Sequence, residues 1–386
     1  MTNLMNRRVL ISGASVAGLT AAYWFHQYGF PVTVVERFAG LRPGGHAIDV
    51  RGTALDVAER MGVLGGLRDA STSMRGMSIV DQAGNELSRS TEETLSGGAL
   101  GGADVEVMRD DLCEALYATT RADVEYIFGD AVAGIELNVD EVRVTLESGP
   151  PRSVDLVVGA DGLHSTVRRL AFGPESSFLH HLGNYVGVFT TPNFLDLDYW
   201  QVWMQMGDRG GVIMSARDNA EARVYLGFGS EQLDYDYRDI GVQKRLLADQ
   251  MAGAGWEVPR MLEFMWEAED FHFDSMSQIR MDRWSSDRIS LVGDAGYAGS
   301  PLSGQGTSVA MVGAYILVDE LNRANGDHRR GYAAYESRMR TWVEQNQQLA
   351  LLSGERHKAA AEGRDPARVE GPVLDDVKSA IALGHH

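Results

Sequence analysis

The chain has 386 residues, 44% of them hydrophobic and 23% charged, which is ordinary globular composition with enough length for one large domain or two interleaved ones. It carries 54 acidic and 35 basic residues, and the formal charge of −19 would repel a nucleic-acid backbone or an anionic membrane surface. The single cysteine, Cys113, excludes an internal disulfide and a cysteine-based metal site, so a redox activity needs a bound cofactor.

The start of the chain lacks the apolar core of a signal peptide, and the longest apolar stretch, near 309–318, is too short for a membrane span. We therefore expect a cytoplasmic protein without nucleic-acid or membrane partners. We expect a monomer, with a weak dimer as the alternative. Residues 383–386 are read as a possible cloning remnant, and the two terminal histidines are given no role.

A βαβ unit opens the chain, with a short apolar strand at 8–12, a glycine-containing turn, a helix to about Tyr28 and a second strand at 32–35. The next expected elements, in chain order, are a helix at 53–60, a hairpin at 77–87, a helix that begins at Arg109, a meander at 124–128, 131–137 and 142–146, and a strand at 154–158.

Alternating segments between residues 183 and 228 predict an antiparallel sheet, one face of which is a candidate binding wall. The expected elements after it are helical pattern at 242–269, strands at 271–279 and 288–292, and helices at 307–322 and 332–352.

The first motif, Gly13-Ala14-Ser15-Val16-Ala17-Gly18, lies where a dinucleotide fold needs a tight turn and free amides for a pyrophosphate. Gly13 allows the turn and Gly18 allows close helix packing, whereas Ser15 replaces the usual central glycine. Glu36 lies about 20 residues further on, where a carboxylate accepts hydrogen bonds from ribose hydroxyls. The alternative is an ordinary strand, turn and helix without a ligand.

Two further motifs place an acid directly after a buried strand. Asp161 follows Val157-Val158-Gly159-Ala160 at the end of the strand expected at 154–158. Asp294 follows Leu291-Val292-Gly293 at the end of the strand expected at 288–292, with Pro301-Leu302-Ser303-Gly304-Gln305-Gly306 beyond it. Asp294 suits a ribityl hydroxyl, and the amides after Gly304 suit negative charge at the N1–C2=O edge of a reduced flavin. The alternatives are that Asp161 merely caps the next helix and that Arg168 is a solvated charge on that helix.

Together the three motifs resemble those of class A flavin monooxygenases, the aromatic hydroxylase family, over nearly the whole chain. The spacing of Arg42, Gly44-Gly45, Asp49 and Arg109-Asp110-Asp111-Leu112 is similar to that of the tetracycline-inactivating members. The resemblance implies an α/β fold in which an FAD-binding domain is interleaved with a substrate domain built on an antiparallel sheet. The implied division is 1–75, 101–176 and 277–330 for FAD, 76–100 and 177–276 for substrate, and 331–386 for a C-terminal bracing helix and tail.

The resemblance also implies tightly but non-covalently bound FAD, NADPH or NADH as transient reductant, and O2 as co-substrate. One oxygen atom would pass, through a flavin C4a-hydroperoxide, to a polycyclic or aromatic compound. A tetracycline-type antibiotic, hence antibiotic resistance, and a polyketide intermediate are the candidates. No catalytic residue is expected, because the flavin carries the chemistry. By the resemblance Arg42 would meet the nicotinamide cofactor, and Asp49 and Arg109 would meet FAD, although an ion pair within the loop is an alternative for Arg42 and Asp49.

The expected cofactor-binding residues are Gly13, Ser15, Ala17, Gly18, Glu36, Arg37, Arg42, Asp49, Arg109, Asp161, Gly293, Asp294, Pro301, Gly304, Gln305 and Gly306. The expected substrate-binding residues are Gln201, Met214, Tyr297, Pro301 and Gly304.

Three positions depart from the family pattern. Tyr297 stands where the family usually has histidine, Ser300 replaces the first of two prolines, and Ser308 replaces an asparagine. No spacing of His46, His164, His180 and His181 supports a metal site. Two rival functions remain, an FAD-dependent reductase or dehydrogenase without oxygen insertion, and a non-enzymatic protein that sequesters a small molecule.

Overall fold

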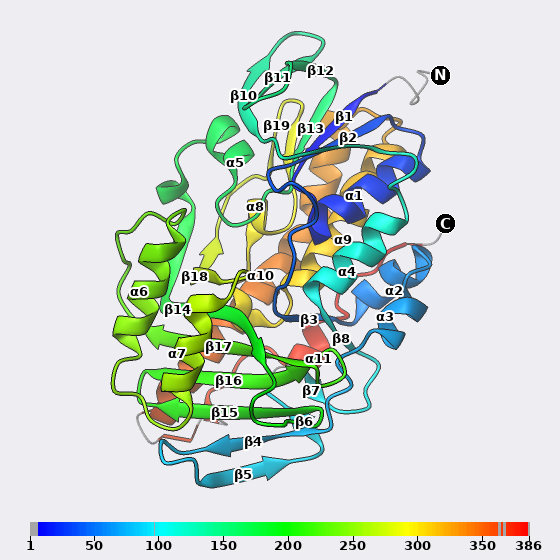
Figure 1. Ribbon diagram of the computed structural model, residues 1–386. Coiled ribbons are helices and arrows are strands. Elements are labelled where there is room, and N and C mark those ends of the chain that lie inside the picture. Colours follow the sequence, from blue (N-terminus) through cyan, green and yellow to red (C-terminus); the bar gives the residue numbers. More distant parts are fainter. Residues whose placement is uncertain (1–6, 96, 362–363, 366–367, 385–386) are drawn as a thin grey trace.

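A parallel sheet organises the upper half of the computed structural model, which describes residues 7–95, 97–361, 364–365 and 368–384 (Figure 1). In spatial order its strands are β19 (Ser285–Ser286), β20 (Ile289–Leu291), β13 (Leu156–Gly159), β1 (Val9–Ser12), β2 (Val32–Glu36) and β9 (Glu125–Phe128). All neighbours run parallel except β19, which is antiparallel to β20. The three central strands are buried along their whole length, as is typical of a parallel sheet covered on both faces.

Helices and a small sheet complete this half. They are α1 (Val16–Gln27), α2 (Thr53–Arg60), α3 (Leu64–Asp69), α4 (Arg109–Ala118), α5 (Thr166–Ala171), α9 (Gly306–Arg323) and α10 (His328–Ala361). The small antiparallel sheet consists of β10 (Val132–Leu137), β11 (Val142–Leu146) and β12 (Arg152–Val154). Helix α9 packs between α1 and α10, and β11 contributes Val142, Val144 and Leu146 to the same hydrophobic core.

The meander expected at 124–146 is wrong in its first strand. β9 is the edge strand of the parallel sheet, where it pairs with β2. The chain turns out of that sheet at Gly129, whose φ is +74°. The carboxylate of Asp130 then accepts hydrogen bonds from the amides of Ala131, Ser148 and Gly149, at 2.8, 3.0 and 2.8 Å, and fixes the start of the separate small sheet.

A seven-stranded sheet forms the lower half (Figure 1). In spatial order its strands are β18 (His272–Ile279), β14 (Leu179–Pro192), β17 (Glu221–Gly229), β16 (Arg209–Ala216), β15 (Trp200–Met206), β4 (Gly76–Val80) and β5 (Glu86–Ser90). The antiparallel sheet expected at 183–228 is confirmed, and the one parallel pair is β15 with β4. The boundary expected at residue 277 lies inside β18, whose last residue still pairs with β14.

Two helices cover one face of this sheet, α6 (Ile240–Gln250) and α7 (Val258–Glu267). The helical pattern expected at 242–269 corresponds to these two helices. Their buried side chains, Leu247, Met261 and Met265 among them, pack in one cluster with Val224 and Leu226 of β17. Because side chains alternate along a strand, residues 223 and 225 of β17 point to the opposite face, toward the upper half of the molecule.

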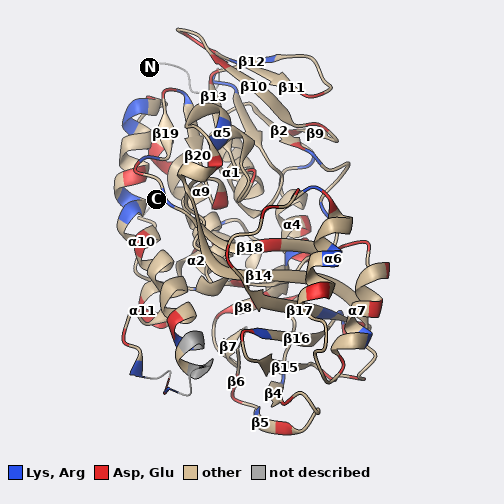
Figure 2. Ribbon diagram, turned by 90° about the vertical axis from the view of Figure 1, so that its left-hand side faces the viewer, with Lys and Arg blue, Asp and Glu red and all other residues tan. Residues whose placement is uncertain are grey.

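Several short elements join the two halves. They are β3 (Ala47–Val50) paired with β8 (Val105–Met108), β6 (Glu93–Thr94) paired with β7 (Gly98–Ala99), α8 (Asp294–Tyr297), α11 (Leu374–Val377), and the single 3-10 turns η2 (Glu175–Ser177) and η3 (Pro301–Ser303). Helix α10 runs along the edge of the molecule and carries acidic and basic residues along its length (Figure 2). Its Gln347 side chain donates to the carbonyl of Ile279, the last residue of β18, at 2.8 Å.

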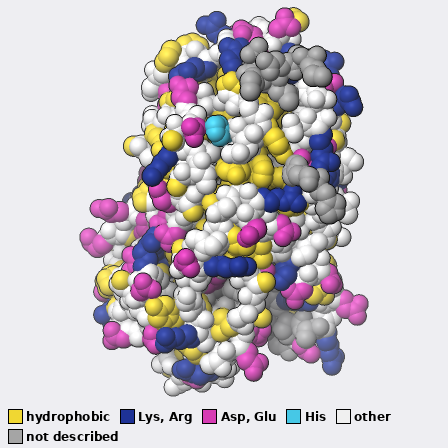
Figure 3. Space-filling model, turned by 90° about the vertical axis from the view of Figure 1, so that its right-hand side faces the viewer, with side chains coloured by type: hydrophobic (Ala, Val, Ile, Leu, Met, Phe, Trp, Pro, Cys, Tyr) yellow, Lys and Arg dark blue, Asp and Glu magenta, His cyan; other side chains and the backbone are white. Residues whose placement is uncertain are grey.

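On the face shown in Figure 3, acidic and basic side chains are intermixed rather than gathered in a patch of one sign. Across the described ranges, no helix is both long enough and apolar enough to cross a membrane.

Candidate functional site

The three acidic or glycine-rich motifs begin at one edge of the parallel sheet. Ser12 of β1 lies in register with Gly159 of β13, which lies in register with Leu291 of β20. Each of these residues ends its strand, and a motif follows it directly. Ligands of open α/β sheets bind in the crevice outside the carboxyl ends of the strands, so the register brings the three motifs to such a crevice.

The motifs also contact one another. A Cβ atom on Gly13 would lie 2.5 Å from the carbonyl oxygen of Ala160, so the first turn packs directly on the second motif. A Cβ on Gly293 would lie 3.0 Å from the Cβ of Ala17, which joins the first motif to the third. A Cβ on Gly18 would overlap the Gly13 carbonyl oxygen, so only glycine lets α1 begin this close to the turn.

The carboxylate expected to meet ribose turns back onto the glycine-rich turn. Glu36 Oε2 accepts a hydrogen bond from the amide of Ala14 at 2.7 Å, and its Oε1 accepts one from Phe38 at 3.0 Å. Ser15 is the N-cap residue of α1, and its hydroxyl lies 3.9 Å from the sulfur of Cys113, which is buried on α4. The first turn thus presents amides and a carboxylate, while Arg37 lies exposed beside it.

Asp161 does cap the helix that follows it. Its carboxylate accepts hydrogen bonds from the amides of Thr166 and Val167 at 2.9 and 3.1 Å and from the hydroxyl of Ser165. The reading of Arg168 as a solvated charge is wrong, because its side chain is fully buried. Its guanidinium donates to the carbonyl of Leu163 at 2.6 Å and pairs with Glu175 at 2.9 Å.

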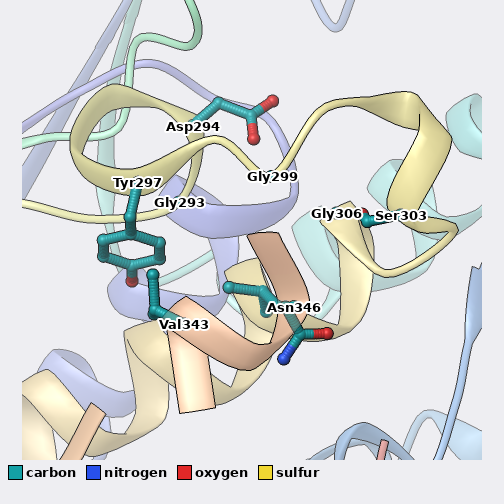
Figure 4. Close-up of a pocket in the computed structure, with 9 residues that line it drawn as sticks. Gly293, Asp294, Tyr297, Gly299, Ser303, Gly306, Val343 and Asn346 are labelled. Carbon is teal, nitrogen blue, oxygen red and sulfur yellow. The ribbon is translucent and has the colours of Figure 1, made fainter. Parts of the chain in front are cut away.

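Asp294 begins α8 and opens onto the crevice, although protein surrounds it on most sides. Burial and the nearby charge of Asp274 raise the pKa of this carboxyl to about 6. Figure 4 shows Asp294 and Tyr297 leaving α8 in different directions, with Tyr297 directed toward Val343 of α10. Both residues line a cavity of about 10 Å³, room for one water molecule.

Tyr297, expected to bind substrate, lies instead in the core. Its side chain is 2% exposed and its ring centroid lies 4.6 Å from that of Trp284. The hydroxyl of Tyr335 donates to the Tyr297 hydroxyl at 2.9 Å. A Cβ on Gly313 of α9 would overlap the same hydroxyl, so the missing side chain at Gly313 makes the space that Tyr297 fills.

The loop between α8 and α9 holds the other departures. Ser300 has φ +75°, a conformation that proline cannot adopt, which explains why the usual proline is absent. Pro301, Gly304 and Gly306 are exposed along this loop, whereas Gln305 is fully buried. Neither polar atom of the Gln305 amide has a hydrogen-bond partner in the described structure.

Two arginines and a tyrosine hold the loop that precedes β3. Arg109 donates to the carbonyls of Arg42, at 2.7 Å, and of Gly44. From the seven-stranded sheet, Arg223 Nε donates to the Gly45 carbonyl at 3.1 Å, and the Tyr225 hydroxyl accepts from the amide of Ala47 at 2.8 Å. The loop is therefore fixed from both halves of the molecule, and neither Arg223 nor Tyr225 was expected from the sequence.

Asp49, the expected FAD contact, and Arg42, the expected nicotinamide-cofactor contact, differ in whether they form an ion pair within the protein. Asp49, within β3, forms an ion pair with Arg51 at 2.8 Å. Within the described residues, the side chain of Arg42 has no carboxylate within ion-pair distance. Burial and the neighbouring Arg109 lower the pKa of Arg42 to about 10. Arg42 is thus a partly desolvated cation that suits a phosphate.

Two of the expected substrate residues lie together on the face of the seven-stranded sheet that α6 and α7 do not cover. Gln201 pairs in register with Met214, and both are buried. Trp203, half-buried on the same face, donates its ring N–H to the Gln201 side-chain oxygen at 3.0 Å. Arg223 pairs with Met214 on the next strand, so a cation and an aromatic ring flank the two expected residues.

The histidines serve hydrogen-bonded roles. His164 bonds Glu175 at 3.0 Å and Asp274 at 3.2 Å, and His181 bonds the carbonyl of Ser230 at 2.8 Å. Burial, His272 and two arginines lower the pKa of His46 to about 3, so its imidazole is neutral. In the part of the chain that the structure describes, no group of three potential ligands could hold a metal ion.

The donors and acceptors of the crevice fit FAD. The start of α1 offers backbone amides to a pyrophosphate, and Glu36 and Asp294 offer carboxylates to hydroxyl groups. The unpartnered buried amide of Gln305 is the strongest sign of a missing partner, because a buried amide without hydrogen bonds is costly.

Comparison with known proteins agrees with this chemistry. A profile described as FAD binding domain matches residues 6–350. An uncharacterized protein of Mycobacterium tuberculosis is 53% identical over 343 residues, which cover 89% of this chain and 92% of the relative. A flavin-dependent monooxygenase of Legionella longbeachae is 39% identical over 350 residues, covering 91% of this chain and 89% of the relative.

Solved structures extend the likeness to the fold. The crystal structure of tetracycline destructase Tet(51) matches with a TM-score of 0.89 and 34% identity, covering 98% of this chain and 100% of that one. Tetracycline destructase Tet(55) matches with a TM-score of 0.85 and 34% identity, covering 99% of each chain. The chain therefore belongs to the FAD binding domain family, and it is an FAD-dependent monooxygenase.

Proposed function

We propose that this monooxygenase inserts one oxygen atom from O2 into a polycyclic aromatic compound of tetracycline type, with NADPH or NADH as reductant. The observation that carries the proposal is that the seven-stranded sheet is hydrogen-bonded to the segment around the start of β3. Arg223 donates to the Gly45 carbonyl, and the Tyr225 hydroxyl accepts from the Ala47 amide. We infer that the sheet face carrying these two residues lies opposite the FAD motifs. The names of the two tetracycline destructases support the substrate class.

The residues of the parallel-sheet motifs and those of the seven-stranded sheet have different proposed roles. FAD, when bound, supplies the reduction by NAD(P)H and the reaction with O2. Glu36, Asp294 and the start of α1 hold the cofactor. The sheet face around Trp203, Met214 and Arg223 holds the substrate and excludes water, which protects a reactive site from side reactions. Arg42, a cation without a carboxylate partner among the described residues, is the proposed contact for the nicotinamide cofactor's phosphates.

The test is a screen of tetracyclines and related polycyclic compounds with the FAD-loaded enzyme, in which NAD(P)H consumption, hydrogen peroxide release and product mass are measured together. We expect a substrate to accelerate NAD(P)H consumption, to suppress peroxide release and to gain one oxygen atom. A reduced product that forms without O2 would favour the reductase alternative. Purified protein that neither carries nor binds FAD would support the sequestering alternative.

A matched pair of variants tests the sheet face. Trp203→Leu removes the half-buried ring next to Gln201, and we expect a higher KM for substrate and more peroxide released per NAD(P)H consumed. Trp266→Leu, on the exposed side of α7 where the ring is 47% exposed, should leave both values unchanged. Equal effects of the two variants would place the substrate elsewhere.

A further inference from the structure

Arg51 lies beside the loop that begins α9. Its Nη1 atom is 3.8 Å from the position that a Cβ on Gly304 would occupy, so its guanidinium borders the exposed Gly304 backbone. The amide of Arg51 donates to the hydroxyl of Ser308 at 3.0 Å, and that hydroxyl lies 3.4 Å from the Asp49 carbonyl. The first turn of α9 therefore fixes the end of β3, and Ser308, a departure from the family pattern, has a structural role.

The Arg51 guanidinium is a buried charge that is paired with the Asp49 carboxylate. Its side chain is 4% exposed, that of Asp49 is 11% exposed, and the pair is 2.8 Å apart. Of the two Asp49 carboxylate oxygens, Oδ1 has no hydrogen-bond partner in the described structure. Burial is the main cause that raises the pKa of Asp49 to about 7; Arg51 opposes this rise, and Glu106 and Asp104 add to it. The ion pair therefore joins two side chains that are both largely shielded from solvent.

Other charges near the pair are largely engaged with each other. Asp104 binds Lys378 at 2.8 Å, and Lys378 also binds Asp375 at 2.7 Å. The C-terminal segment covers this side of Arg51, because the amide of Thr53 donates to the Lys378 carbonyl at 3.2 Å. Gly304 is a separate neighbour of the guanidinium, close to its Nη1 atom.

Reduction of FAD by NAD(P)H transfers a hydride, that is two electrons and one proton, and leaves NAD(P)⁺. The reduced ring then carries one negative charge at its N1–C2=O edge. Amides at a helix start stabilise such a charge, and a buried cation does so more strongly than an exposed one. We propose that Arg51 is the cation that stabilises the anionic reduced flavin, with Asp49 as the partner that limits this effect, so that the pair sets the reduction potential of the bound FAD.

This inference rests on the placement of the flavin ring at the Gly304 loop, and the test separates it from the substrate proposal. The measured quantities are the FAD dissociation constant and the two-electron midpoint potential of the bound flavin, with no substrate present. Arg51→Gln should weaken binding of reduced FAD about tenfold more than binding of oxidised FAD, which lowers the potential by about 30 mV. Arg51→Lys should keep most of the wild-type potential, because it keeps the charge.

Asp49→Asn removes the counter-charge and should shift the potential upward, opposite to Arg51→Gln. This variant keeps the test decisive if Arg51→Gln fails to fold. Arg68→Gln, an exposed residue on α3, is the matched control and should leave the potential unchanged. A wild-type potential in Arg51→Gln, or in Asp49→Asn, would overturn the inference even if tetracyclines prove to be substrates. Failure of every tetracycline to react would leave these shifts in place and would count only against the proposed substrate.

Discussion

Arg168 donates a hydrogen bond from its guanidinium to the backbone carbonyl of Ala295 at 3.0 Å, and so ties the second motif to the third. The two residues are far apart in the sequence, and the buried arginine has no exposed surface through which it could act otherwise. A charged side chain that is buried, paired with Glu175 and bonded to two carbonyls holds its surroundings in one arrangement. Arg168 thereby fixes the position of α8, on which Asp294 lies.

Replacing Arg168 by glutamine should lower the free energy of unfolding by about 2–3 kcal/mol, because hydrogen bonds to a charged group are lost and the carbonyls stay buried. FAD should also bind more weakly, since α8 loses its tether. Urea denaturation and FAD titration measure the two effects. Arg169→Gln, the exposed neighbour on α5, should stay within about 0.5 kcal/mol of wild type. Similar losses in both variants would contradict the assigned role.

Gly18→Ala should reduce FAD affinity at least tenfold, because its Cβ would push α1 away from the Gly13 carbonyl and move the amides at the helix start. FAD fluorescence titration gives the dissociation constant. Gly66→Ala on α3 is the control, since a Cβ there would meet nothing within 4 Å. That variant should be more stable by about 0.5–1 kcal/mol, with unchanged FAD affinity.

Ser300→Pro should destabilise the α8–α9 loop by about 3 kcal/mol or more, because proline cannot reach φ +75°. Ser300→Gly should be tolerated or slightly stabilising, since glycine adopts positive φ without strain, although it loses the hydroxyl that accepts from the Leu302 amide. Thermal unfolding with and without FAD compares the two. A stable, FAD-loaded Ser300→Pro protein would show that the loop has another conformation.

His164 should make stability depend on pH. Burial alone would lower its pKa, but hydrogen bonds to Asp274 and Glu175 outweigh burial and raise the pKa to about 9. Because the folded-state pKa exceeds the ordinary value of 6.5, the stabilisation is complete below about pH 6.5 and is lost as the pH rises through 9.

The stability difference between wild type and His164→Gln should therefore shrink by about 1–3 kcal/mol between pH 6 and pH 10. Urea denaturation at a series of pH values measures this difference. Gln27→Asn, at the exposed and uncharged last residue of α1, is the control and should run parallel to wild type across the range. A constant gap for His164→Gln would mean that folding leaves the pKa of His164 unchanged.

The sequence predicts the site best where a buried strand is followed by a glycine in a tight turn or by an acidic residue. Gly13 and Asp294 each follow an apolar run, and the parallel register of those runs brings both to one crevice. Such local patterns need no knowledge of the rest of the chain. The strands of the seven-stranded sheet were found in the same way, from alternation.

The remaining contacts of the site depend on how distant segments pair, and local sequence patterns do not predict them. β3 is four residues long and is a strand only because β8 pairs with it, so the ion pair of Asp49 with Arg51 could not be located from the sequence. Arg223 was read as part of an alternating strand, and its bond to Gly45 depends on how two distant segments meet. The direction of Tyr297 likewise depends on residues of α9 and α10.

Tyr297 and Gly313 also constrain how such an enzyme could have changed over time. A side chain at 313 cannot enter while the tyrosine hydroxyl fills that space, whereas a tyrosine at 297 needs the space already open. Tyrosine at 297 therefore goes together with glycine at 313, and a substitution at 313 is compatible with this packing only when the tyrosine hydroxyl is absent.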